Sequence, residues 1–273
     1  MRRQALLSLR SQNYSLSTLN LALNDDFYYQ FHLIGPCPNL SSLRIATDVA
    51  DERPANDRIV LEAKVWLRSC KSLRKLDIGI TKYFAVFLTD FLLDDIPLRT
   101  LNLRPLATGC DKTFYQALAA KASLKELRLE FIGDQYTDLI DQDFLEAVLR
   151  MTSLESLDID SEALKEEFVI AAAKRMSQLR LFRVFSATLT DAIWPSMNKL
   201  QKLKTLEVWS PHHFSSSGIT SYISRLGPGN RGLHVKIVPP SSGITKDDVA
   251  EFETELKAKV DGSLDYNFLK SPA

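Results

Sequence analysis

Four short groups of residues in this 273-residue chain have side chains that could do chemistry. His212-His213 could ligate a metal, Ser215-Ser216-Ser217-Gly218 could hold a nucleophile, and Asp94-Asp95 and Asp247-Asp248 could act as carboxylate pairs. Adjacent histidines point apart on an extended chain, and no cysteine or third histidine stands near them, so a metal site would lack ligands. The serines lack the Gly-x-Ser-x-Gly frame of a nucleophile elbow and fit a helix-starting turn. The aspartate pairs are typical of helix ends.

The sequence also contains no phosphate-binding loop and no dinucleotide fingerprint. It therefore predicts no catalytic residue, no metal ligand and no cofactor, and we expect a protein that is not an enzyme. The rival hypothesis is an enzyme with an unfamiliar site. A cluster of acid–base groups with shifted pKa values in a pocket would be needed to support that rival.

Composition excludes several classes of partner and location. The 34 basic and 34 acidic residues balance, which argues against nucleic acid or a membrane surface as the partner. The three cysteines show no paired spacing, which favours free thiols in a reducing compartment, so we expect a cytoplasmic or nuclear protein. The apolar run at the N-terminus is too short for a signal peptide, and no stretch approaches the ~20 apolar residues that span a bilayer.

One phrase recurs along almost the whole chain and organises it. In Leu124-Lys125-Glu126-Leu127-Arg128-Leu129, an apolar residue is followed by two residues, another apolar residue, one residue and a third apolar residue. The middle apolar residues of the copies, called the anchors here, are Leu19, Leu43, Leu76, Leu101, Leu127, Leu157, Phe182, Leu206 and Val235. Successive anchors are 24 to 33 residues apart. A recurrence at such intervals indicates a solenoid of stacked repeats.

The segments between the phrases have helical periodicity. They cover residues 55–70, 83–94, 113–122, 137–151, 162–176 and 217–226. Thr190-Asp191-Ala192-Ile193-Trp194 begins like a capped helix that Pro195 then limits. Strand and helix in alternation predict parallel strands with right-handed crossovers. The expected fold is an α/β solenoid bent into a horseshoe, with strands on the concave face and helices on the convex face.

The expected solenoid occupies residues 1–244 in about eight or nine irregular repeats, and residues 245–273 form a capping helix and tail of the same domain. Thr245-Lys246-Asp247-Asp248 has a variant of the capping box. Residues 245–260 should then form a helix that covers the open end of the sheet, because exposed strand edges are a liability. Residues 263–273 are expected to fray.

Strand side chains alternate between faces, so the residue after each anchor should point to the concave surface. This central column reads Asn20, Arg44, Asp77, Asn102, Arg128, Asp158, Arg183, Glu207 and Lys236. The column two residues further on reads Ala22, Ala46, Gly79, Arg104, Glu130, Asp160, Phe185, Trp209 and Val238. The charges could simply pair across strands, each exposed pair contributing ~0–1 kcal/mol, or they could form a recognition surface.

Phe185 and Trp209 should be neighbours on adjacent strands. Clustered exposed aromatics mark binding sites, although a loop or the terminal helix could cover this pair instead. The predicted partner-binding residues are Phe185, Trp209, Arg183, Glu207, Arg128, Asp158, Asp160, Arg104 and Glu130.

The nine phrases with helical connectors, including Cys37-Pro38-Asn39-Leu40-Ser41-Ser42-Leu43 and Cys70-Lys71-Ser72-Leu73-Arg74-Lys75-Leu76, resemble the leucine-rich-repeat superfamily over about residues 14–238. Their irregular lengths look most like the repeat portion of fungal F-box proteins, although residues 1–15 are too short to hold an F-box. The resemblance implies binding of a protein partner on the concave face, often to select substrates for ubiquitination. We therefore expect a non-enzymatic interaction module. The alternative is the substrate-recognition part of an F-box-type ubiquitin ligase receptor, with ligase components as further partners of a longer form.

Overall fold

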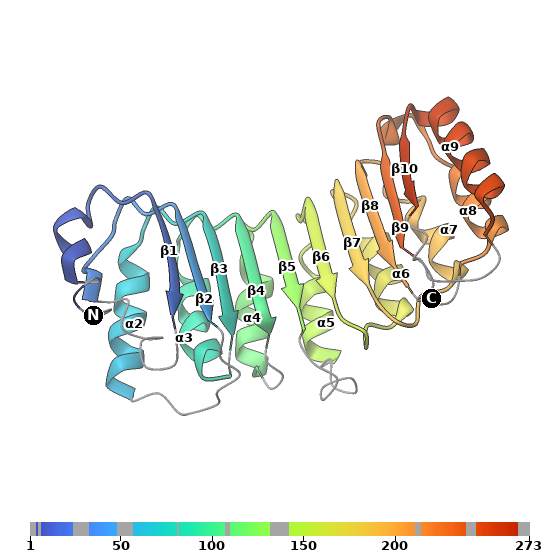
Figure 1. Ribbon diagram of the computed structural model, residues 1–273. Coiled ribbons are helices and arrows are strands. Elements are labelled where there is room, and N and C mark those ends of the chain that lie inside the picture. The colour runs from blue at the N-terminus through green and yellow to red at the C-terminus, as the bar shows by residue number, and fades with distance from the viewer. Residues whose placement is uncertain are drawn as a thin grey trace, which may run out of the picture. The chain divides into compact units, whose positions relative to one another are not determined.

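The computed structural model describes residues 4, 7–23, 33–47, 57–80, 82–106, 110–131, 142–210, 214–238 and 244–266. The chain divides into two compact units. The first comprises Met1–Ile132 and Asp141–Val148, and the second comprises Gly133–Ile140 and Leu149–Ala273. Strands and helices alternate in both units, and in each the helices lie on one side of the strands (Figure 1).

The first unit contains five parallel strands that lie in chain order. They are β1 Thr18–Leu23, β2 Ser42–Thr47, β3 Lys75–Ile80, β4 Thr100–Leu106 and β5 Glu126–Glu130. Its helices are α2 Asp57–Ser69, α3 Lys82–Leu93, α4 Lys112–Ala120 and α5 Gln142–Leu149. Neighbouring strands set the predicted anchors opposite one another, so that Leu43 lies between Leu19 and Leu76.

The second unit repeats the same arrangement. Its parallel strands are β6 Ser156–Asp160, β7 Leu181–Phe185, β8 Thr205–Trp209, β9 His234–Val238 and β10 Ser263–Tyr266. Its helices are α6 Glu166–Arg175, α7 Trp194–Met197, α8 Ser216–Ser224 and α9 Lys246–Val260, and each packs against the next. The anchor Phe182 lies opposite Leu157 on one side and Leu206 on the other.

The anchors form the core because they sit on the strand face that the helices cover. Every anchor is buried, and so are the apolar residues two positions later in β2 to β9, for example Ile78 and Val208. Each fully buried leucine or isoleucine contributes roughly 1.5–3 kcal/mol relative to exposure. In a solenoid, no repeat buries its apolar face without its neighbours, and the anchors here are buried in that way. The predicted α/β repeat solenoid is therefore confirmed.

One register shift interrupts the first unit. Ile78 lies opposite Leu103, but Ile80 lies opposite Leu106, so Arg104 and Pro105 of β4 both stand against Gly79. Pro105 has no N–H to continue the ladder, which accounts for the extra residue. The predicted outer column is therefore irregular here, and Gly79 is not in simple register with Arg104.

The predicted C-terminal helix is present as α9 with its capping box. The Thr245 hydroxyl accepts from the Asp248 N–H at 3.1 Å, and the Asp248 carboxylate accepts from the Thr245 N–H at 2.7 Å. α9 packs on α8 and on the strand that follows it. That strand corrects the expectation of a frayed tail, because residues 263–266 form β10, in which Leu264 lies opposite Val235. Residues 267–273 lie outside the described part of the chain.

The join between α7 and α8 depends on one carboxylate. Asp191 accepts hydrogen bonds from the Trp194 indole N–H at 3.0 Å, the Ser215 amide at 3.1 Å and the Ser215 hydroxyl at 2.5 Å. A Cβ at Gly218 would overlap this carboxylate, so glycine is required for the close approach. Pro195 lies in the first turn of α7, where its missing N–H costs nothing, and so it opens the helix rather than limiting it.

Candidate functional site

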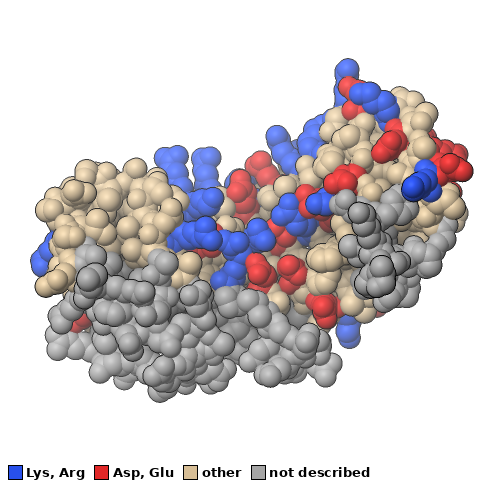
Figure 2. All heavy atoms as spheres, in the orientation of Figure 1, with Lys and Arg blue, Asp and Glu red and all other residues tan. Residues whose placement is uncertain are grey.

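The side of each unit's sheet that the helices leave uncovered is called the open face here. It carries the outward columns that alternation predicts, and Figure 2 shows basic and acidic side chains mixed over it in both units. None of the described helices combines the length and apolar character needed to cross a membrane. The open face presents the outward columns to solvent and is the candidate surface for a site.

Two aromatic side chains lie together on the open face of the second unit. Phe185 and Trp209 are register partners in β7 and β8, with ring centroids 4.4 Å apart and planes inclined by 52°. Trp209 is 44% exposed, whereas Phe185 is half-buried. The prediction that these residues are outward neighbours is confirmed. The alternative that the terminal helix covers them is wrong, because α9 packs on α8 and β10 and leaves Trp209 exposed.

The aromatic pair has an apolar border that the sequence analysis did not use in full. Val238 lies opposite Trp209 in β9 and is half-buried. Leu181, at the start of β7, is another half-buried apolar residue on an outward position, with Arg183 between it and Phe185 on the same face. Leu181 was missed because only the columns after the anchors were followed, although strand alternation also turns the residue before each anchor outward.

Arg183 holds two carboxylates beside the aromatic pair, a group called the Arg183 cluster here. Its Nε and Nη2 donate to the two Glu207 oxygens at 2.7 and 2.8 Å, and its Nη1 donates to Asp158 Oδ2 at 2.9 Å. Asp158 is only 6% exposed. The hydrogen bonds and charge of Arg183 lower the pKa of Glu207, with smaller contributions from Lys236 and His234. The hydrogen bond with Glu207 in turn raises the pKa of Arg183 above its ordinary value.

Six of the nine predicted site residues thus come together in the second unit: Phe185, Trp209, Arg183, Glu207, Asp158 and Asp160. Asp160 lies opposite Phe185 at the end of β6. The guanidinium fork fixes both carboxylates in place, because bidentate pairing is directional as well as strong. The resulting surface is a rigid apolar patch with a charged border.

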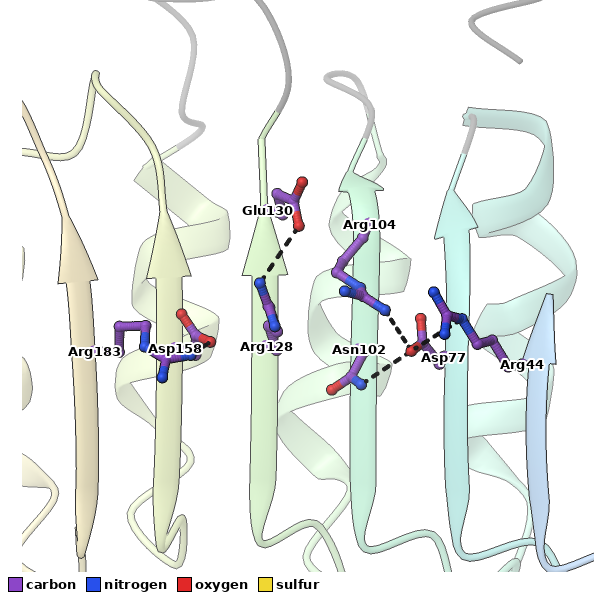
Figure 3. A network of polar contacts seen from close by, with 8 residues as sticks. All are labelled: Arg44, Asp77, Asn102, Arg104, Arg128, Glu130, Asp158 and Arg183. Carbon is purple, nitrogen blue, oxygen red and sulfur yellow. Dashed lines mark hydrogen bonds and ion pairs between the residues drawn. The ribbon is translucent and has the colours of Figure 1, made fainter. Parts of the chain in front are cut away.

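The other three predicted residues, Arg104, Arg128 and Glu130, lie on the open face of the first unit (Figure 3). Arg104 donates to Asp77 Oδ2 at 2.6 Å, and Arg128 Nη2 lies 3.7 Å from Glu130 Oε2. Asp77, which is 8% exposed, also accepts a hydrogen bond from Asn102 Nδ2 at 3.4 Å and forms an ion pair with Arg44, whose Nε lies 3.8 Å away. The interpretation that charges pair across strands is confirmed for Asp77 with Arg44 and Arg104, whereas Arg128 and Glu130 pair within β5.

The serine turn and the buried cysteines, two further candidates for chemistry, occupy structural positions in the described part of the chain. Ser215 caps α8 by accepting the Gly218 N–H at 3.0 Å, as the helix-starting turn predicted. Burial raises the pKa of both Cys70 and Cys110 to about 12, so neither thiol is a ready nucleophile at neutral pH. Within the described residues, no three His, Cys, Asp or Glu side chains gather where they could hold a metal ion. His212-His213 lies outside the described residues.

The fold and its exposed aromatic pair define a repeat solenoid with an open strand face. No family model matches the chain, and no curated protein matches it. Among solved structures, it is similar to a chain of the yeast Rad7–Elc1 complex, with 15% identity, a TM-score of 0.55, and coverage of 96% of this chain and 69% of that chain. It also matches the tropomodulin C-terminal domain of Caenorhabditis elegans at 13% identity and a TM-score of 0.38, covering 65% of this chain and 93% of that one. At these identities the likeness shows the fold alone.

Proposed function

We propose that this protein is a non-enzymatic interaction module that binds a partner protein through the open face of its second unit. The observation that carries the proposal is the aromatic pair. Trp209 is the one tryptophan of three that is exposed, since Trp66 and Trp194 are both buried. A large aromatic side chain left in water beside a second ring is a feature of binding surfaces.

The surroundings of the pair support this role. Interface energy is concentrated in a few aromatic and arginine residues that a polar border shields from water. The Arg183 cluster supplies such a border, and its mutual hydrogen bonds hold the side chains in place before a partner arrives. Less conformational entropy is then lost on binding. The yeast structure with the same fold is a complex of two proteins, which adds support for protein binding.

The test uses Trp209 as its own reporter. Affinity purification with mass spectrometry identifies the partner, and the purified partner is then titrated into the protein while tryptophan emission is recorded. We expect a blue shift on binding, because Trp209 moves from water into an interface while the other two tryptophans are already buried. Phe185→Ala with Trp209→Ala should abolish capture of the same partner.

The matched control is Leu93→Ala, which removes another exposed large apolar side chain, at the end of α3 in the first unit. Its capture of the partner should equal that of the wild type. Unchanged capture by a folded Phe185→Ala, Trp209→Ala variant would refute the proposed site. Loss of folding in that variant would mean that the rings serve the core rather than a partner.

A finer proposal follows from the irregular repeat lengths, which resemble those of the fungal F-box proteins with leucine-rich repeats. In this form, the bound partner is a ubiquitination substrate, and ligase components join through a longer form of the protein. A full-length transcript with an upstream helical module, and ubiquitination of the captured partner, would support it. We also propose a cytoplasmic or nuclear location, which microscopy of a fluorescent fusion would test.

A further inference from the structure

Three cations without internal partners stand at the start of two neighbouring strands in the first unit, and they are called the edge cations here. Lys75 begins β3, and Arg74 and Arg99 immediately precede β3 and β4. All three are exposed, and none forms an ion pair with any residue that the structure describes. The Arg99 N–H donates to the Arg74 carbonyl at 2.8 Å, so the two backbones are adjacent. Figure 2 shows basic side chains gathered along this edge of the sheet.

This arrangement is unfavourable for the isolated protein. Like charges on adjacent strand positions repel each other and destabilise the sheet. Several other cations of the first unit have carboxylate partners. Arg68 donates to Asp94 at 2.6 and 2.8 Å, and Arg104 donates to Asp77 at 2.6 Å. The edge cations thus form a local excess of positive charge in a chain with balanced charge overall.

The second unit shows that the same repeat position can carry satisfied cations. Arg180 and Lys204 precede β7 and β8 with the same backbone pairing, since the Lys204 N–H donates to the Arg180 carbonyl at 2.7 Å. Arg180 Nε lies 3.8 Å from Glu155 Oε2. Lys204 Nζ donates to the carbonyls of Gly229 and Arg231 at 3.1 and 2.7 Å. The missing partners at the edge cations are therefore specific to the first unit.

We propose that Arg74, Lys75 and Arg99 form a second docking surface, which binds an acidic segment of a partner protein through its carboxylates. Arginine suits this role because its planar fork pairs bidentately with carboxylate. Neighbouring strands are ~4.8 Å apart, and alternate side chains of an extended peptide lie on one face ~6.8 Å apart, so every second Asp or Glu side chain falls within reach of the long side chains of neighbouring cations.

The surroundings favour an acidic peptide over nucleic acid. A protein groove that binds nucleic acid places cations against many phosphates and stacks the bases on aromatic side chains. Here the outward residues beside Lys75 are the hydroxyl-bearing Ser42 and Thr100. The next strand places a carboxylate at the equivalent position, where Glu126 accepts a hydrogen bond from Thr100 at 3.0 Å. Glu126 would repel a phosphate chain that continues past Lys75 and Thr100, whereas a short carboxylate run can end before it.

The test is fluorescence anisotropy with a short fluorescein-labelled oligoglutamate peptide. We expect the wild type to bind it, and salt to weaken binding. Arg74→Gln with Lys75→Gln and Arg99→Gln should weaken binding about tenfold or more, because three charge pairs are lost. The matched control is Arg180→Gln with Lys204→Gln, which removes two cations of the same repeat position and should leave binding unchanged.

Equal loss in both variants, or no binding by the wild type, would overturn the proposal. An oligothymidine of similar length that displaces the peptide and binds more tightly would also overturn it, in favour of nucleic acid. The melting temperature of the triple variant should be unchanged or higher, because repulsion is relieved. Since this surface and the aromatic pair lie in different units, failure here leaves the proposed function intact, and the double aromatic variant should still bind oligoglutamate.

Discussion

Arg183 is the residue whose charge matters most for the second unit, since it satisfies both Asp158 and Glu207. We expect Arg183→Ala to lower the free energy of unfolding by about 1–2 kcal/mol at neutral pH, because the two carboxylates are left facing each other without a cation. This estimate is below that for a fully buried pair, because the Arg183 side chain is partly exposed. Urea denaturation followed by circular dichroism measures the change.

The same pair sets a pH dependence. Arg183 lowers the pKa of Glu207 below its ordinary value of 4.5. The pair's contribution to the free energy of unfolding is therefore complete above pH 4.5 and is lost as the pH falls through the pKa of Glu207 in the folded state. In Arg183→Ala that depression disappears, and protonation of Glu207 relieves repulsion. The difference in unfolding free energy between wild type and variant should therefore shrink from neutral pH to about pH 3. Arg180→Ala, which removes only an exposed cation, should show a small difference with little pH dependence; an equal effect of both substitutions would contradict the role given to Arg183.

At the scale of a single strand, alternation separates core from surface within one residue. Leu127 is fully buried in β5, and the next residue, Arg128, lies on the open face. Leu127→Asp should destabilise the protein by more than about 3 kcal/mol, because it puts an unpaired carboxylate among apolar anchors. Arg128→Ala should change the melting temperature far less. Differential scanning calorimetry compares the two, and similar melting temperatures would be inconsistent with the strand register.

Between elements, Gly218 allows α8 to approach the Asp191 carboxylate. Gly218→Ala should cost about 1–3 kcal/mol, because the added methyl displaces the carboxylate and breaks its hydrogen bonds to Ser215. Gly227→Ala is the matched control, since no atom lies within 4 Å of a Cβ placed there. Chemical denaturation of both variants is the measurement. A loss as large in Gly227→Ala would point to a general effect of removing glycine and not to the Asp191 contact.

At the scale of the molecule, the last repeat protects the end of the array. Removing residues 245–273 takes away α9 and β10 and exposes α8 and the edge of β9. We expect a lower melting temperature and aggregation, because repeat arrays need polar terminal units for solubility. Light scattering during a thermal ramp tests this. Removing only residues 267–273 keeps both elements, and a shortened chain without α9 and β10 that remains monomeric with unchanged unfolding would show that they are dispensable.

Sequence reasoning reached the parts of the fold that repeat. The anchors recur along the chain and each is apolar, so strand positions and the outward direction of Phe185 and Trp209 followed from alternation. It failed where a single repeat departs from the pattern. Pro105 introduces a bulge that shifts the outer column, and β10 has only one clear anchor, Leu264, in a segment of four residues.

The charged residues were harder to interpret because sequence does not say where a long side chain ends. The charged columns predicted either internal pairing or a recognition surface, and only the positions of the Arg104 and Arg183 guanidinium groups show that these two residues pair internally. The edge cations went unnoticed for the opposite reason. Arg74 and Arg99 look like other basic residues before a strand, and their lack of partners is visible only in three dimensions.

The contact between Asp191 and Gly218 also bears on how such a chain changes in evolution. Repeat arrays lengthen or shorten when the DNA of one unit is duplicated or deleted. Some contacts between repeats of the second unit are backbone hydrogen bonds, which any copied repeat can supply, such as that from the Lys204 N–H to the Arg180 carbonyl. The Asp191 join instead requires the Ser215 hydroxyl and the bare Cα of Gly218 in the unit that follows. A duplication that separated these residues would lose the contact, so the repeat that contains Asp191 and the repeat that contains Ser215 and Gly218 are expected to be inherited together.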